Sequence, residues 1–168
     1  ALLFGLARAQ SSTLEGHRLG EAFNNLSRSF EYYAEAGNVA LAVAAAEFPI
    51  APLRNLVTGA PELMARALTL VPPNSHEAGR ILSRYGGVLG VVKCDYEGAQ
   101  QALGRAIDIA RREGDLPLEM QTLTYAAAVN SNHLRWQESV ENGLRAIELA
   151  PGDENIWSEV DSCFWTAK

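Results

Sequence analysis

Residues 94–115 read CDYEGAQQALGRAIDIARREGD and predict a turn, one complete amphipathic helix and a second turn. Small and apolar side chains recur at spacings of three and four, with charged and amide side chains opposite them. Asp95 can cap the start of this helix and Gly114 can end it, while Arg111 and Arg112 suit the cation-favouring last turn. The stretch therefore predicts a helix that packs one face on a neighbour. That face comprises Ala99, Ala102, Leu103, Ala106, Ile107 and Ala110.

The same order of features returns forty residues later, in RWQESVENGLRAIELAPGD at residues 135–153. Tyr96 corresponds there to Trp136. Two earlier copies, ELMARALTLVPP and NNLSRSFEYYAEAGN, are weaker but keep the phase. A period near forty with two helices in each unit is typical of a helical repeat array. The equivalent small residues are Ser29, Ala67, Ala106 and Ala146, which are 38, 39 and 40 residues apart.

The chain is therefore predicted to be all-α and to form one domain of antiparallel helix pairs over residues 1–168. Its start at Ala1 and its end inside a helical pattern suggest a portion of a longer protein. The approximate repeats are 1–37, 38–73, 75–115 and 116–152, with a partial repeat or capping helix at 153–168. The first predicted helix starts near Leu2 and is broken at residues 11–16. The further predicted helices, besides the one in residues 94–115, span 17–36, 38–48, 61–70, 75–92, 116–132, 136–150 and 154–167. A loop is predicted around residues 49–62.

The sequence resembles the tetratricopeptide repeat in three features. A pair of small and apolar residues lies near the end of each second helix, an aromatic residue follows a turn, and a Pro closes the repeat. The copy at residues 75–115 departs from the family where Gly86, Gly87 and Gly90 replace larger residues, and we expect a neighbouring backbone to approach closely at Gly86 and Gly90. The resemblance implies an α-solenoid, a right-handed superhelix of about four repeats plus a terminal helix. The last copy carries it most fully, in Trp136, Ser139, Ala146, Leu149 and Pro151.

A narrower resemblance rests on repeats longer than the roughly 34 residues of the standard unit. With the segments ARREGD, LLFGLARAQ and EYYAEAGN, the chain resembles the sensor region of large bacterial multidomain regulators. These include LuxR-type ATPase regulators and cyclase-linked signalling proteins. The resemblance implies a cytoplasmic module for signal transduction or transcription regulation.

Composition limits the classes of partner. A net charge of −6 and a pI near 5.1 argue against direct binding of nucleic acid, which starts with a basic face on the phosphates. No apolar run reaches the roughly 18 residues of a membrane span, because Glu47 and Pro49 interrupt the longest one. The two cysteines, Cys94 and Cys163, fit a reducing compartment, and we expect both to be small buried hydrophobes.

The sequence carries no recognisable catalytic motif, and we expect no enzyme activity, no cofactor and no metal. The segment YGGVLGVVK lacks the Lys and Ser/Thr of a phosphate-binding loop. The cluster Phe30, Tyr32 and Tyr33 is expected to pack between repeats rather than stack on bases. The histidines and acids are expected to be solvated, with none of the burial that acid–base catalysis needs. They are His17, His76, His133, Glu97, Glu113, Glu119, Glu138, Glu141 and Glu148.

In tetratricopeptide proteins the first helix of each pair lines the concave side, and this suggests a candidate binding surface. Arg84 is its one positive residue, so the paired cations that grip a terminal carboxylate in co-chaperones are missing. An equally weighted alternative is that these side chains merely solvate a structural face. The candidate residues are Ile81, Arg84, Val88 and Val91 from one first helix, and Gln121, Thr124, Ala128 and Ser131 from the next.

Three function hypotheses follow. The first is a non-catalytic module of a bacterial regulator, which binds a protein, a peptide, an effector or adjacent domains of the same polypeptide. The second is a free-standing interaction scaffold with no regulatory output. An all-helical enzyme is a third, which would need a deep pocket with clustered titratable groups. The apolar residues Trp157, Phe164 and Trp165 of the last predicted helix suggest cover by a further helix or by a second molecule in a dimer.

Overall fold

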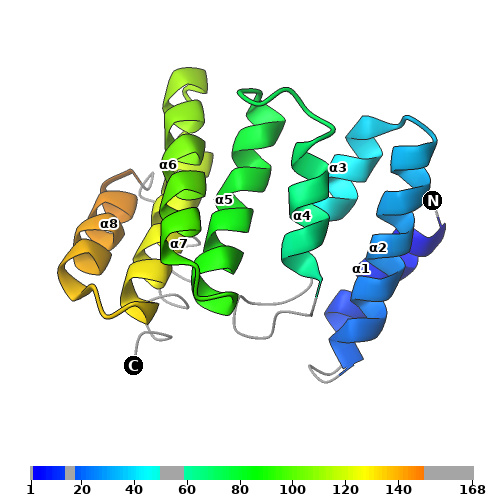
Figure 1. Ribbon diagram of the computed structural model, residues 1–168, viewed down its shortest axis with the longest axis horizontal. Helices are drawn as coiled ribbons and strands as arrows, with labels where there is room; N and C mark the ends of the chain where they lie inside the picture. Colours follow the sequence, from blue (N-terminus) through cyan, green and yellow to red (C-terminus); the bar gives the residue numbers. More distant parts are fainter. Residues whose placement is uncertain (1, 14–17, 50–58, 150–168) are drawn as a thin grey trace. The chain divides into compact units, whose positions relative to one another are not determined.

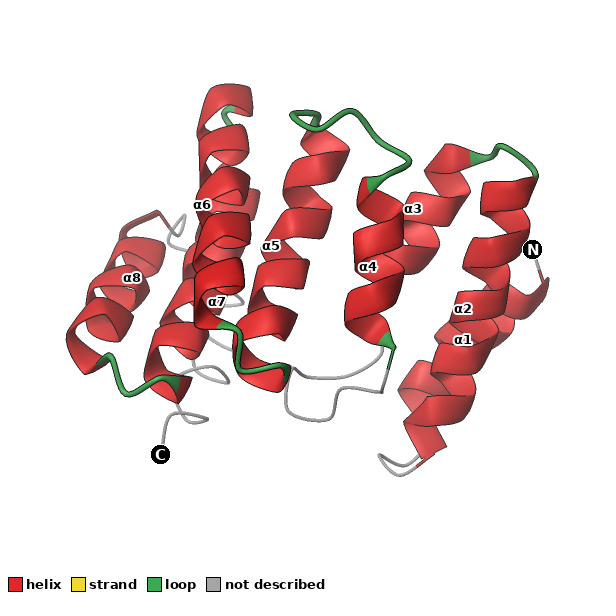
Figure 2. Cartoon of the chain, viewed as in Figure 1, coloured by secondary structure: helices red, strands yellow, loops and turns green. Residues whose placement is uncertain are grey.

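The structure is a computed structural model that describes residues 2–13, 18–49 and 59–149. This part of the chain contains eight α-helices and no strand, and consecutive helices pack antiparallel within each unit (Figures 1 and 2). The predicted all-α class is confirmed. The helices are α1 (Leu2–Thr13), α2 (Leu19–Glu35), α3 (Val39–Glu47), α4 (Ala60–Leu68), α5 (His76–Val92), α6 (Tyr96–Glu113), α7 (Leu116–Asn132) and α8 (Trp136–Leu149).

The chain divides into two compact units, Ala1–Ile81 and Leu82–Lys168, so that α5 begins in the first and ends in the second. None of the described helices is long and apolar enough to cross a membrane. The predicted helix at 154–167 and residues 50–58 of the predicted loop at 49–62 lie outside the described residues, and the end of that predicted loop belongs to α4, which begins at Ala60.

The first helix is longer than its sequence predicts. A break was expected from Ser11, but α1 continues to Thr13. The hydroxyls of Ser11 and Thr13 donate to the carbonyl oxygens of Arg8 (2.7 Å) and Ala9 (2.9 Å). Ser and Thr side chains can hydrogen-bond to the backbone in ways that disrupt a helix. Here they donate to carbonyl groups of the preceding turn, which is compatible with a continuous helix.

Helix α2 is amphipathic, as predicted, and ends at a left-handed Gly37 with φ of 68°. Phe30 and Tyr33 are buried, but Tyr32 is 64% exposed. The prediction that all three aromatic rings pack in the core is therefore wrong for Tyr32. The other buried residues of α2 are Leu19, Ala22, Phe23, Leu26 and Ser29.

Helix α3 is capped by Asn38, whose side chain accepts a hydrogen bond from the Leu41 amide at 3.2 Å. Its sequence predicts burial all round, but only one face is buried, and Val39 and Leu41 in the first turn are exposed. The composition was apolar enough for a core helix, but no described element covers that turn. The buried face consists of Ala42, Val43, Ala45 and Ala46.

Helix α4 begins with Pro61 in its first turn, as predicted, because a helix start leaves amide groups unpaired there in any case. Arg66 pairs with Glu31 of α2, and its guanidinium lies 5.3 Å from the centre of the Phe30 ring. The hydrogen bond from Arg66 lowers the pKa of Glu31. This exposed pair joins α2 to α4 within the first unit.

Helix α6 begins and ends where its predicted capping residues place it, and α7 has the predicted span, Leu116–Asn132. The carboxylate of Asp95 accepts from the Gly98 amide at 2.9 Å, and that of Asp115 accepts from the Leu118 amide at 3.0 Å. Between the two helices, Gly114 adopts φ of 69°, which only glycine reaches without strain.

The turns that join α5 to α6 and α7 to α8 have the same backbone form forty residues apart. Cys94 and Leu134 each adopt a left-handed conformation, with φ of 55° and 59°. Cys94 is exposed and unbonded, so the prediction that it is a buried hydrophobe is wrong. A residue at the tip of a turn has no core to enter. Cys163 lies outside the described residues.

Three of the four small residues that set the period occupy matching places in their helices. Ser29, Ala67, Ala106 and Ala146 are all buried. Three of them, Ser29, Ala106 and Ala146, lie ten residues after the first residue of their helix. For these three residues, the repeat in sequence therefore corresponds to the same position along the helix.

Candidate binding surface

Helices α5 and α7 lie side by side and run in the same direction, over the part of α5 that belongs to the second unit. The hydroxyls of Thr122 and Ser83, 39 residues apart, are hydrogen-bonded at 2.9 Å, and both residues are fully buried. Further along both helices, the Asn132 side chain donates to the Val91 carbonyl at 3.4 Å. The offset between these neighbouring helices is therefore close to the sequence period.

Glycines allow α5 to approach its neighbours. A Cβ on Gly90 would lie 2.4 Å from Val129, and one on Gly86 would lie 2.6 Å from Leu103 and 3.1 Å from the Ala99 carbonyl oxygen. The predicted approach of a neighbouring backbone is confirmed at Gly86, where the Ala99 carbonyl oxygen is close. At Gly90 the prediction is wrong, because the neighbour is the side chain of Val129.

The residues predicted on α5 separate into two groups. Ile81 is 1% exposed and Val88 is fully buried, so neither side chain can meet a ligand. Their assignment to a binding surface is wrong, because α5 buries residues on more than one face. Arg84 and Val91 are half-buried.

The residues predicted on α7 lie together on one face of that helix. Gln121 is exposed, and Thr124, Ala128 and Ser131 are half-buried. Their spacings of three, four and three place them along one line of the helix. The Thr124 hydroxyl donates to the Met120 carbonyl at 3.0 Å. We call these four residues the α7 strip.

Tyr125 borders the α7 strip and was missed in the sequence. It is half-buried, and its ring lies where a Cβ on Gly87 would come within 3.2 Å of it. The signal that could have found it is Gly87, since a glycine inside a helix usually makes room for something. An aromatic ring beside small and polar residues gives a surface a rigid contact group.

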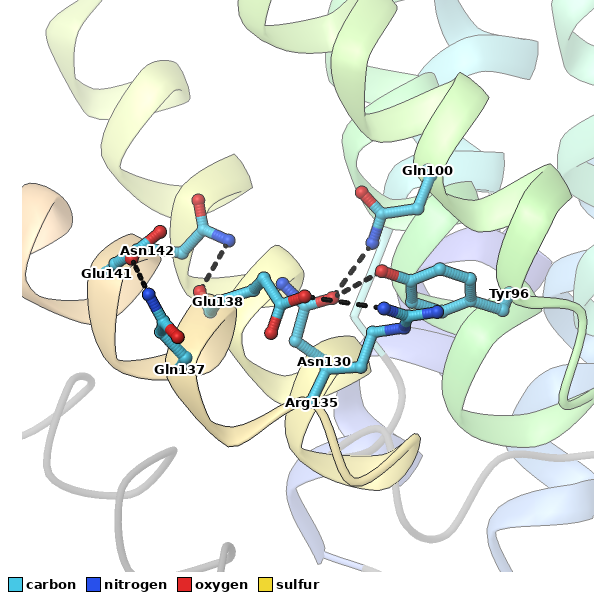
Figure 3. A network of polar contacts seen from close by, with 8 residues as sticks. All are labelled: Tyr96, Gln100, Asn130, Arg135, Gln137, Glu138, Glu141 and Asn142. Atoms are coloured by element: carbon cyan, nitrogen blue, oxygen red, sulfur yellow. Dashed lines mark hydrogen bonds and ion pairs between the residues drawn. The ribbon is translucent and has the colours of Figure 1, made fainter.

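A polar junction holds the end of α7 against the start of α6 (Figure 3). Asn130 is 2% exposed, and its Oδ1 accepts from the Tyr96 hydroxyl at 3.0 Å and from Gln100 Nε2 at 3.1 Å. Its carbonyl oxygen accepts from the amides of His133 and Arg135, at 3.2 and 2.9 Å. The side chain of Asn130 therefore fixes the end of α7 against α6, and its backbone carbonyl holds the turn that follows.

His133 belongs to the same junction. Its Nε2 lies 2.9 Å from the Gly90 carbonyl oxygen, and its ring centre lies 5.0 Å from that of Tyr96. Facing a carbonyl, Nε2 carries the proton and donates. The prediction of a solvated His133 is wrong, because the ring bridges α5 and α6. His76 begins α5 and is half-buried, and His17 lies outside the described residues.

Arg135 extends the junction to α8 (Figure 3). Its guanidinium lies 4.8 Å from the centre of the Tyr96 ring, and its Nη1 lies 3.4 Å from the Glu138 carboxylate. Gln137 donates to Glu141 at 3.0 Å, on the outer side of α8. These contacts orient side chains, and none places a nucleophile beside a base.

Glu119 is the one predicted solvent-facing acid that the structure places in the interior of the second unit. Its Oε1 lies 2.7 Å from Nε of Arg111 on α6 and 3.8 Å from Nη2 of Arg145 on α8. The prediction was wrong because α7 has neighbours on both sides, which leaves the acid buried between two cations. Such an arrangement sets helix register more than it adds stability.

The described residues hold no group of three or more His, Cys, Asp or Glu side chains that could bind a metal ion. A shallow cavity of about 470 Å³ lies in the first unit, against Gly5, Arg8, Ala9, Ser12 and Phe48. It contains none of the predicted site residues. Searches with protein-family models, among curated proteins and among solved structures give no match to this chain.

Proposed function

We propose that the chain is a non-catalytic helical-repeat module of the tetratricopeptide type, an α-solenoid that binds a protein or peptide. The observation that carries this proposal is the α5–α7 pair. Two first helices lie in parallel at the spacing of the sequence repeat, with Ser83 bonded to Thr122 across 39 residues. An array of this kind presents its first helices on one continuous surface.

The binding surface of the proposal is the α7 strip together with Tyr125, Arg84 and Val91. It contains neutral polar side chains, small apolar groups, one cation and one aromatic ring, which suits an extended segment with mixed side chains. In a bacterial regulator this module would pass binding on to other domains of the same polypeptide. A nucleotide-binding or helix-turn-helix domain encoded in the same reading frame would support that role, and a reading frame without either would leave only the scaffold.

The test is a peptide selection followed by mapping. A random peptide library displayed on phage is selected against the chain, and the selected peptides are titrated into ¹⁵N-labelled protein. We expect amide shifts at Gln121, Thr124, Ala128 and Ser131, and at least tenfold weaker binding by Ala128→Glu. The control is Gln101→Glu on the exposed side of α6, which should bind normally. Peptides that map away from α7, or bind Ala128→Glu unchanged, would overturn the proposal.

A further inference from the structure

Arg8 of α1 is a cation with no carboxylate partner among the described residues, although the chain carries a net charge of −6. Its guanidinium lies instead 5.9 Å from the centre of the Phe4 ring and 5.8 Å from that of the Phe48 ring. Aromatic rings engage the face of a guanidinium and leave the N–H donors at its edge available. By contrast, glutamates pair with three further arginines of the first unit, Arg18, Arg66 and Arg80.

The same arginine borders the shallow cavity of about 470 Å³ in the first unit. Gly5, Ala9 and Ser12 line the cavity from one side of α1, since they follow one another at spacings of four and three. Phe48, the residue that ends α3, lines it from a second helix, and its ring meets that of Phe4 edge-on at 6.0 Å. The volume falls within the roughly 300–1,000 Å³ of small-molecule sites.

We propose that this cavity binds a small carboxylate with a flat apolar body, as in an aromatic acid. The guanidinium of Arg8 donates two parallel N–H bonds to the carboxylate and matches its single charge. A phosphate dianion would need a second cation, and the described residues that line the cavity include none.

The remaining lining residues suit the rest of such a ligand. A flat body fits a shallow cavity, and the Phe48 ring gives it an aromatic contact. The Ser12 hydroxyl lies 3.4 Å from the Arg8 carbonyl oxygen, which is a long hydrogen bond that it can exchange for one to the ligand. The site therefore recognises charge at one end of the ligand and an apolar surface at the other.

This inference goes beyond the proposed function, because the cavity and the α7 strip differ in place and in ligand. The cavity belongs to the first unit and takes a small anion, whereas the α7 strip belongs to the second unit and takes a peptide. Peptide binding at the α7 strip is measured separately, so failure here leaves the proposed function intact.

The test is an NMR titration of the full ¹⁵N-labelled chain with cinnamate, and with neutral cinnamamide as the matched probe. We expect saturable amide shifts at Gly5, Ala9 and Ser12 with cinnamate, and at least tenfold weaker binding of cinnamamide. Arg8→Gln should weaken cinnamate binding at least tenfold, because the charge is lost. The control is Arg28→Gln, at an exposed arginine of α2, which should bind normally.

Gly5→Met tests the cavity without touching the charge. Nothing lies within 4 Å of a Cβ at Gly5, and Met is a good helix former, so this variant fills the cavity without straining α1. It should weaken cinnamate binding at least tenfold, with the amide shifts of α6 and α7 unchanged. Gly20→Met, at an equally open position of α2, should bind normally.

Four outcomes would overturn the inference. They are no saturable binding at millimolar cinnamate, equal binding of cinnamate and cinnamamide, shifts that map away from the cavity, and unchanged binding by Gly5→Met. Inorganic phosphate that displaces cinnamate at an equal concentration would overturn it as well, since the site would then recognise any anion.

Discussion

Beyond their apolar cores, the two compact units hold their helices together with different kinds of contact. In the first unit exposed ion pairs join helices, as in Glu31 with Arg66. In the second unit buried contacts join helices, sterically at Gly90 against Val129, through the hydrogen bonds of Asn130, and through Glu119 between Arg111 and Arg145. When a buried contact is lost, water cannot take the place of the missing partner. Exposed ion pairs are already weakened by water and dissolved salt. Substitutions should therefore affect the second unit more, and changes of pH or salt the first.

The largest effect is expected at Gly90. Gly90→Ala would place a methyl group 2.4 Å from a Val129 methyl, so that α5 and α7 must separate. Overpacking of this kind costs about 1–3 kcal/mol of unfolding free energy. Urea denaturation, with hydrogen exchange in α5 and α7 to identify the unit that unfolds, measures the loss.

Two further variants decide whether this contact is the cause. Val129→Ala in the Gly90→Ala background should restore stability, with a coupling of about 1 kcal/mol or more between the two sites. Gly104→Ala is the matched control, because nothing lies within 4 Å of a Cβ at this helical position. It should gain about 0.5–1 kcal/mol from helix propensity. Equal effects of Gly90→Ala and Gly104→Ala would contradict the assignment.

The next effect is expected at Asn130. Asn130→Ala leaves the Tyr96 hydroxyl and the Gln100 amide without their shared acceptor in a half-buried site. Leaving such groups unsatisfied costs about 1–2 kcal/mol, and Tyr96→Phe should cost less in that background than alone. Chemical denaturation of the four proteins gives the coupling. Additive losses would show that the junction does not act as a unit.

Local sequence signals predicted the elements of the second unit well. Asp95 and Gly114 predicted the ends of α6, because a cap acts on the amides within its own turn. The glycines of α5 similarly announced a close approach. The spacing of side chains could not predict how many neighbouring helices each helix packs against.

The failures of prediction share that origin. Ile81 and Val88 fit a concave surface by spacing but are buried, and Glu119 fits a solvent face but lies between Arg111 and Arg145. The burial of each residue depends on helices tens of residues away. A period of three and four residues gives one apolar face per helix, and these helices bury more than one.

A smaller effect, dependent on pH, is expected from Glu47 in the first unit. Burial raises the pKa of Glu47, and the Arg80 guanidinium, 2.9 Å away, only partly opposes this. Glu77 adds to the rise and His76 opposes it. A raised pKa means that the folded state holds the proton more tightly, so Glu47 lowers stability as pH rises above its unfolded value of 4.5.

Glu47→Gln removes this titration, so the variant should become more stable than the wild-type chain as pH increases from 4 to 7. The difference should fade as the pH falls well below 4.5, where Glu47 is protonated in both states. Thermal unfolding at several pH values measures the effect, with Glu35→Gln, an exposed acid of the same unit, as control. A variant that is less stable at pH 7 would mean that the bond to Arg80 outweighs burial.

The smallest effect is expected at Arg66, whose pair with Glu31 has both side chains largely in water. Arg66→Gln should change the unfolding free energy least of the four substitutions, because solvent screens the charges and two long side chains lose freedom in pairing. The pKa of Glu31 is more sensitive, since the hydrogen bond from Arg66 holds it down.

An NMR titration of the Glu31 carboxyl carbon tests this directly. The pKa should rise in Arg66→Gln, and it should rise in the wild-type chain when salt is added up to 1 M. A lowered pKa stabilises the folded state above the unfolded value, and that contribution is lost as pH falls through the folded one. If Arg66→Gln were instead as damaging as Gly90→Ala and insensitive to salt, the pair would be behaving as a buried contact. The distinction between exposed ion pairs in one unit and buried contacts in the other would then fail.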